Sequence, residues 1–94
     1  MILLSPAAVE DIERLRTFLD AVDPDAAKRA LALIWKAIDR LPEFPALGKP
    51  TDDADIRQIV VRFGSSAYIV RYVAGPDTGD ILITRLWHGR EART

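Results

Sequence analysis

The amino-acid sequence predicts an α+β fold, with an N-terminal short strand and an antiparallel helical hairpin packed on a small antiparallel β-sheet. Two observations carry this prediction. Apolar residues recur at three- and four-residue steps through residues 6–41, and the period shortens to that of strands in residues 56–87. Turn signals separate these segments at the spacing of a helical hairpin and then of a meander. Helices on one face of an antiparallel sheet are the simplest packing for this order of elements.

A short apolar strand and a first helix are predicted at the start of the chain. Residues 1–4 are apolar and run into Ser5 and Pro6. Serine is a preferred N-cap, and proline suits the first helical position because its missing N–H has no partner there. The apolar stripe that follows predicts a helix from Pro6 to Ala21. This stripe consists of Val9, Ile12, Leu15, Leu19 and Val22.

A second helix is predicted from Pro24 to Leu41. Asp23 before Pro24 is a typical start signal, because an acidic cap suits the positive end of a helix. A turn of about two to four residues separates the two helices, so we expect an antiparallel hairpin. Pro42 and Pro45 end the second helix.

A connector and three strands complete the predicted fold. Residues 42–55 hold three prolines, a glycine and a run of acids, and we expect an exposed loop there. Three segments rich in Ile, Val and Tyr then predict an antiparallel meander. Neither face of the middle segment is clearly polar, so the face that packs on the hairpin stays open at this point. The predicted strands are Ile56–Phe63, Ala67–Val73 and Asp80–Trp87.

Length and composition exclude several classes of protein. The chain has 94 residues, which predicts a single domain over residues 1–94. It has no cysteine and one histidine, so we expect neither a disulfide framework nor a metal site. The acids Asp52, Asp53 and Asp55 are better explained as a solvated loop than as metal ligands. No glycine-rich phosphate loop is present, and no cofactor is expected.

Hydropathy and charge also limit the partners of the chain. The longest apolar run is too short to span a membrane, so we expect a cytoplasmic protein without membrane contact. The formal net charge is -1, which argues against binding nucleic acid by bulk electrostatics. Residues 1–55 hold seven Lys/Arg against eleven Asp/Glu, whereas residues 56–94 hold six against three. The sheet-forming half is therefore the basic one.

A basic and aromatic set lies on the predicted sheet. Arginines inside strand patterns are unusual, because each must reach solvent, a carboxylate or a ligand. They could extend to solvent or pair with acids of this chain, or together they could bind a phosphate or a carboxylate of a partner. His88 is a candidate general acid, or simply a residue at a strand end. The set comprises Arg57, Arg62, Arg71, Arg85 and Arg90, with Tyr68, Tyr72, Trp87 and His88.

Some apolar side chains fall off or at the margins of the helical core stripes. One small sheet cannot cover both helices on all sides, so part of this surface is expected to meet a partner. These residues are Leu3, Leu4, Phe18, Leu33 and Trp35.

Segments along the whole chain together resemble one protein family. They are LSPAAVEDIERLRTFL, LPEFPALGKP, IRQIVVRFGSSAYIVRYV and ILITRLWHGRE. In this order they are similar to the toxin subunit of ParE-type toxin–antitoxin modules, in the ParE/RelE superfamily. The resemblance implies a helical hairpin on an antiparallel sheet. It also implies a bacterial toxin held inactive in a hetero-oligomer with a ParD-like antitoxin, through which alone it would contact DNA.

The two branches of this superfamily imply different activities. ParE-like toxins poison DNA gyrase and stop replication, whereas RelE-like toxins cut messenger RNA in the ribosome. His88, Lys49, Arg62 and Arg85 roughly match basic positions of the ribonucleases, but Gly89 stands where those often have tyrosine. Lysines are few, and the HGRE ending is ParE-like. The favoured reading is therefore a gyrase-binding toxin without catalytic residues.

Two alternatives stay open beside the gyrase reading. One is a ribosome-dependent endoribonuclease in which His88 is general acid or base and Arg62 and Arg85 stabilise the transition state. The other is an inactive relative that retains antitoxin binding.

The basic set and the uncovered apolar residues, together with the family resemblance, indicate which residues should bind the target and the antitoxin. For the target they are Arg71, Arg85, Trp87, His88 and Arg90. For the antitoxin they are Phe18, Leu33, Trp35, Arg62, Arg71 and Arg85.

Overall fold

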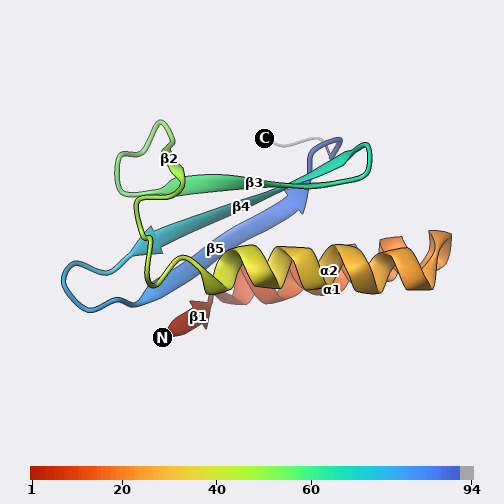
Figure 1. Ribbon diagram of the computed structural model, residues 1–94, viewed down its shortest axis with the longest axis horizontal. Helices are drawn as coiled ribbons and strands as arrows, with labels where there is room; N and C mark the ends of the chain where they lie inside the picture. The colour runs from red at the N-terminus through yellow and green to blue at the C-terminus, as the bar shows by residue number, and fades with distance from the viewer. Residues whose placement is uncertain (92–94) are drawn as a thin grey trace.

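The chain folds into two layers, a helical hairpin and a five-stranded sheet (Figure 1). We describe residues 1–91 of a computed structural model; the last three residues of the expected domain lie outside this range. The predicted α+β fold is confirmed. Its elements are β1 (Ile2–Leu4), α1 (Pro6–Val22), α2 (Pro24–Asp39), β2 (Lys49–Pro50), β3 (Arg57–Phe63), β4 (Ser66–Ala74) and β5 (Ile81–His88).

The sheet has the strand order β1-β5-β4-β3-β2. The meander β3–β4–β5 is antiparallel as predicted, but β1 lies parallel to β5, so the sheet is mixed. Parallel neighbours need a long crossover connection, and here the rest of the chain provides it. The first strand thus pairs with the last and closes one side of the fold.

The turn between the helices is shorter than predicted, because the single residue Asp23 serves both of them. Its backbone N–H donates to the carbonyl of Leu19 at 2.9 Å and so caps the end of α1. Its carboxylate accepts from the amides of Asp25 and Ala26 at 3.1 and 3.2 Å and caps the start of α2. Helix α2 ends at Asp39, two residues before the predicted end.

The connector between α2 and β3 is more ordered than the expected loop. Lys49 and Pro50 form the short strand β2 against Gln58 and Arg57. The buried hydroxyl of Tyr72 donates to the carbonyl of Pro45 at 2.7 Å and accepts from the amide of Gly48 at 2.8 Å. A Cβ at Gly48 would lie 2.7 Å from that hydroxyl, so only glycine fits here.

The core lies between the hairpin and one face of the sheet. In β4 the side chains of Tyr68, Val70 and Tyr72 face the helices, and all three are at most 2% exposed. Ile69 and Arg71 therefore lie on the outer face, which neither α1 nor α2 covers (Figure 1). The helices contribute mainly Ala8, Leu15, Ala30, Ile34 and Ile38, and Leu41 joins them from the turn after α2.

The tip of the hairpin extends past the end of the sheet (Figure 1). A 17-residue helix such as α1 is about 25 Å long, so its last turns lie beyond the strands that cover its first turns. Phe18 and Val22 are accordingly 58% and 75% exposed. The expectation that the hairpin leaves apolar surface uncovered is confirmed at Phe18.

Candidate functional site

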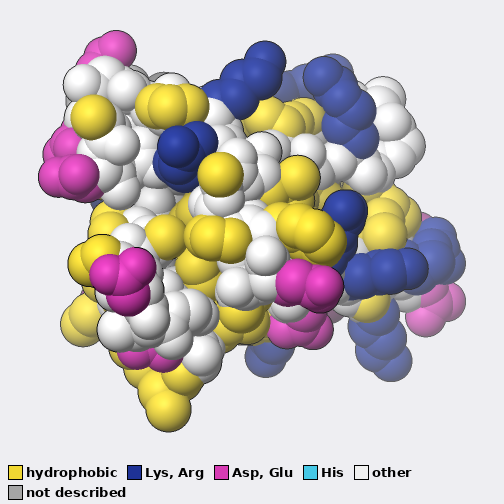
Figure 2. All heavy atoms as spheres, turned by 60° about the vertical axis from the view of Figure 1, so that its left-hand side comes forward, with side chains coloured by type: hydrophobic (Ala, Val, Ile, Leu, Met, Phe, Trp, Pro, Cys, Tyr) yellow, Lys and Arg dark blue, Asp and Glu magenta, His cyan; other side chains and the backbone are white. Residues whose placement is uncertain are grey.

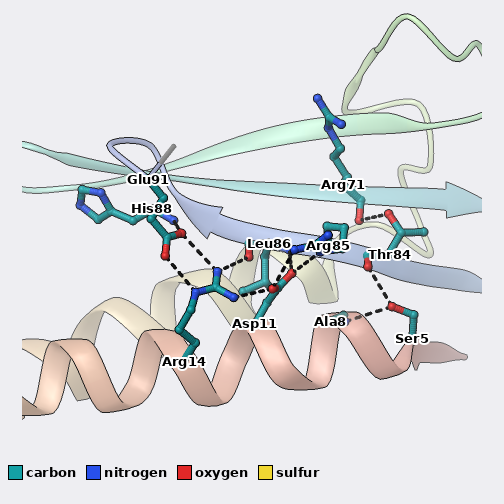
Figure 3. Close-up of polar contacts among 10 residues, drawn as sticks. All are labelled: Ser5, Ala8, Asp11, Arg14, Arg71, Thr84, Arg85, Leu86, His88 and Glu91. Carbon is teal, nitrogen blue, oxygen red and sulfur yellow. Dashed lines mark hydrogen bonds and ion pairs between the residues drawn. The ribbon is translucent and has the colours of Figure 1, made fainter. Parts of the chain in front are cut away.

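The C-terminal part of β5 has a free outer edge that the structure must close. β1 ends opposite Ile83, and β5 continues to His88 with no neighbouring strand on that side among residues 1–91. The amide of Ser5 donates to the carbonyl of Ile83 at 3.0 Å, and its hydroxyl donates to the carbonyl of Thr84 at 2.8 Å. Beyond this point side chains take the place of a strand (Figure 3).

Asp11 is the centre of this closure. Its side chain is 3% exposed and accepts from the amide of Leu86 at 2.9 Å. It also accepts from Arg85 Nε at 2.8 Å and from Arg14 Nη1 at 2.6 Å. Burial alone would raise the pKa of Asp11, but these hydrogen bonds outweigh burial and hold it below its ordinary value. The charged form of the carboxylate is therefore favoured, and both of its oxygens accept hydrogen bonds.

Arg14 extends the closure to the end of the described chain. It donates through Nε and Nη2 to the two oxygens of Glu91, at 2.9 and 3.2 Å, and through Nη2 to the carbonyl of Leu86 at 3.4 Å. Glu91 in turn accepts from the amide of His88 at 2.8 Å. Burial opposes its charge, yet the bonds from Arg14 and His88 lower the pKa of Glu91. We call the pairing of Arg14 with Glu91 the clasp.

The clasp fixes the turn formed by residues 88–91. The amide of Glu91 donates to the carbonyl of His88 at 2.9 Å, and the amide of Gly89 donates to the carbonyl of Ala67 at 2.7 Å. The His88 ring packs edge-on against Tyr68, with centroids 5.2 Å apart. Its Nδ1 accepts from the amide of Arg90 at 3.0 Å, so the neutral ring carries its proton on Nε2.

A pocket of about 370 Å³ lies between this turn and the overhanging part of α1. Figure 3 shows His88 and Glu91 above the part of α1 that follows Arg14. The pocket is lined by Phe18, Ser66, His88, Arg90 and Glu91.

The expected target-binding residues fall into three places. Arg71 stacks on Trp87 on the outer sheet face, with its Cζ 5.0 Å from the ring centroid. His88 and Arg90 lie in the fixed turn. Arg85 lies opposite Arg71 in the register of β4 and β5, beside the bulge at Thr84, but its guanidinium is bound to Asp11 of α1. Arg85 therefore does not join Arg71.

The residues of the catalytic alternative are not brought together. Arg62 lies on the outer face of β3, opposite Ala67. His88 lies opposite Tyr68, whose side chain faces the helices, and Arg85 binds Asp11. In Figure 3 the ring of His88 and the guanidinium groups of Arg85 and Arg71 point in different directions.

The expected antitoxin-binding residues are also divided. Leu33 and Arg62 line a groove between α2 and the edge of β3. Phe18 lines the C-terminal pocket instead, and Trp35 packs partly against the core beside Arg16 and Asp20. Figure 2 shows hydrophobic side chains and Lys and Arg side chains interspersed along the top of the molecule, which is the sheet side.

Sequence reasoning did not identify Asp11, Arg14 and Glu91. A signal was present for Asp11, which lies three residues after Ala8 and four before Leu15 and so shares the buried face of α1. A charge at such a position needs a buried partner. Arg14 and Glu91 carried no comparable signal, because both have the appearance of ordinary exposed charges.

Residues 1–91 contain neither a candidate metal cluster nor a helix that could span a membrane. Within residues 1–91 no three His, Cys, Asp or Glu side chains are grouped so that they could hold a metal ion. None of the helices in that range is both long enough and apolar enough to cross a bilayer.

Comparison with known proteins identifies the relatives of this chain. Residues 2–93 match the family described as the ParE toxin of the type II toxin–antitoxin system parDE. "Toxin RelE1" of Caulobacter vibrioides is 39% identical over 93 residues, which cover 98% of this chain and 96% of the relative. "Toxin RelE3" of the same bacterium is 33% identical over 90 residues, which cover 96% and 95%. The resemblance found in the sequence is thereby confirmed.

A solved structure shares the fold. It is described as the chromosomal ParDE TA system from P. aeruginosa and superimposes with a TM-score of 0.73 over 90% of both chains. The sequence identity is 15%, so this likeness supports the architecture alone.

Removing the charge of Asp11 should destabilise the protein and reduce its sensitivity to acid. We expect Asp11→Asn to lower the free energy of unfolding at pH 7 by about 2–4 kcal/mol, because two guanidinium groups lose their carboxylate. The pKa values of Asp11 and Glu91 are lower in the folded protein than their ordinary values of 3.8 and 4.5, so the two charged carboxylates stabilise the fold when the pH is above those ordinary values. This stabilisation is lost as the pH falls from the ordinary pKa values to the lower pKa values of the folded state. Urea unfolding between pH 7 and pH 3 measures both effects.

The matched control is Glu10→Gln, which neutralises an exposed carboxylate one residue away. It should change the free energy of unfolding by less than about 0.5 kcal/mol. Equal losses in the two variants would show that Asp11 is not the centre of the closure.

Proposed function

The chain belongs to the ParE toxin family of type II toxin–antitoxin systems, and from this premise we propose that it inhibits DNA gyrase by binding it. The proposed action needs no cofactor and no catalytic residue, takes place in the bacterial cytoplasm, and arrests growth by stopping replication. A ParD-like antitoxin neutralises the toxin in a hetero-oligomer, and contact with DNA is made through the antitoxin.

The separation of Arg62, Arg85 and His88 is the observation that supports binding over catalysis. Cleavage of RNA needs a general base, a general acid and cationic groups within reach of one phosphate. Here the Arg85 guanidinium is occupied by Asp11, and Arg62 and His88 belong to opposite faces of the sheet. A binding surface needs no such convergence.

Two surfaces could serve the target. One is the outer sheet face, where Arg71 covers Trp87 and its Nε donates to Gln58 at 3.2 Å. The other is the fixed turn with His88 and Arg90. In this proposal Arg85 contributes through Asp11 by holding the end of β5, and not by touching the target.

The endoribonuclease remains the second candidate function. The names of the two Caulobacter relatives, "Toxin RelE1" and "Toxin RelE3", favour it. In this candidate His88 would donate a proton from Nε2, and Arg62 and Arg85 would have to move before they could share a phosphate.

We place the antitoxin in the groove between α2 and β3. β2 pairs with Arg57 and Gln58, so in the described part of the chain β3 keeps an open edge from Ile59 to Phe63. Exposed apolar side chains line the groove beside that edge, and basic side chains surround them. An extended acidic and apolar segment would gain both backbone hydrogen bonds and charge pairing there. The lining includes Leu33, Leu47 and Val60, with Lys36, Arg40, Lys49 and Arg62.

The gyrase proposal predicts that the purified toxin inhibits DNA supercoiling by purified gyrase. Its expression without antitoxin should arrest growth and induce a DNA-damage response. The supercoiling assay, titrated to saturating toxin, measures the effect, and equimolar antitoxin should reverse it.

Normal supercoiling at saturating toxin would contradict the gyrase proposal. Primer extension on messenger RNA after induction then tests the second candidate. Cleavage that His88→Ala abolishes while the urea midpoint is unchanged would establish the ribonuclease instead.

The groove proposal predicts that Leu33→Asp and Arg62→Glu each weaken antitoxin binding at least about tenfold. Both side chains lie at the surface, so the fold should persist. Calorimetric titration with the purified antitoxin measures the affinity. Arg90→Glu, which changes an exposed arginine outside the groove, is the control and should bind within about threefold of the parent protein. Unchanged affinity in both groove variants would refute this location.

A further inference from the structure

We propose that the pocket between the C-terminal turn and the overhanging part of α1 receives an acidic and apolar protein segment of the toxin's target. This inference rests on the proposed function, since it assumes a protein target. It adds the place of contact and the chemistry that recognises it.

The pocket combines one apolar wall with several polar groups that favour an anion. Phe18 projects from the part of α1 that the sheet does not cover and is 58% exposed. The polar residues that line the pocket are His88, Ser66, Arg90 and Glu91, and the neutral His88 ring carries its proton on Nε2. Within residues 1–91 Arg90 forms no ion pair through its side chain. A carboxylate next to an apolar side chain matches this arrangement.

The one acid in the pocket does not cancel this preference. Glu91 is paired with Arg14 through both carboxylate oxygens, at 2.9 and 3.2 Å, and it also accepts from the amide of His88. Its negative charge is therefore neutralised inside the clasp. Arg90 is left as the unbalanced charge of the lining, and the pocket favours an anionic group.

The clasp also prepares the pocket before a partner arrives. The turn that carries His88 and Arg90 is held to α1 by Arg14 and to β4 by the bond from Gly89 to Ala67. A surface that is already ordered loses little conformational entropy on binding. Arg14 and Glu91 are thus positioning residues, because they act through the turn and not by touching the partner.

Charge on α1 favours a protein segment over nucleic acid. The helix that supplies Phe18 also exposes Glu10, Glu13 and Asp20. These would repel a chain of phosphates, whereas a single carboxylate needs only the one cation that Arg90 offers. The volume of about 370 Å³ accommodates one or two side chains.

Two variants in the pocket test the proposal. We expect Phe18→Ala and Arg90→Glu each to lower growth arrest in cells and gyrase inhibition in vitro at least about tenfold. Both should keep antitoxin affinity within about threefold and the urea midpoint of the parent. Arg90→Lys, which keeps the charge, should retain most of the activity. Arg16→Glu, an exposed arginine of α1 that does not line the pocket, is the matched control.

A third measurement separates positioning from mere stability. Glu91→Gln should lower toxicity while the protein stays folded. Because the chain has one histidine, ring ¹⁵N signals should report His88 directly. They should show the Nε2–H tautomer in the parent and a mixture of tautomers in Glu91→Gln.

Each of the other outcomes contradicts either the pocket as a target site or the proposed function. Full toxicity of Phe18→Ala and Arg90→Glu, or loss of antitoxin affinity in place of toxicity, overturns the pocket as a target site. If the parent protein cleaves messenger RNA and Arg90→Glu abolishes that cleavage, the pocket binds nucleic acid and not a protein segment. A parent that arrests growth without inhibiting gyrase refutes the proposed function but leaves the pocket to be judged on growth arrest. A parent that arrests nothing overturns both.

Discussion

The outer edge of β5 is the constraint on which the C-terminal third of this protein depends. β1 and Ser5 cover the outer edge of β5 as far as Ile83, and five more residues of β5 follow. Their backbone groups lie beside the core and must have hydrogen-bond partners. Asp11, Arg14 and Glu91 supply them at Leu86 and His88. A buried carboxylate is tolerated because every bond it accepts comes from a cation or from the strand itself.

Closing this edge makes the two sides of the sheet unequal. On the β5 side, side chains of α1 block the addition of another strand and fix the turn after His88. On the other side β2 covers only two residues of β3, so the edge from Ile59 to Phe63 stays open beside a basic and apolar groove. The proposed antitoxin and target sites follow from this asymmetry, since one is an open edge and the other a preorganised turn.

The fold was largely predictable because local signals and burial agree. The stripes of both helices and the alternation in β4 identify the elements and their order. The strand β2 was not predictable, because Lys49 and Pro50 form a strand only where the connector is held by Tyr72. The place of the Arg85 guanidinium was not predictable either, since Arg85 lies opposite Arg71 in the register and yet binds the buried Asp11 of α1. The binding residues expected from the sequence were therefore chosen by type and position along the strands, and the structure separates them.

The amide hydrogen exchange of Leu86 and His88 tests the closure of the β5 edge most directly. Both amides point away from β4, and within residues 1–91 their hydrogens are accepted by the carboxylates of Asp11 and Glu91. If Asp11 and Glu91 act as a strand, both amides should exchange as slowly as those in the centre of β4. Exchange at the rate of unprotected surface amides would contradict the account.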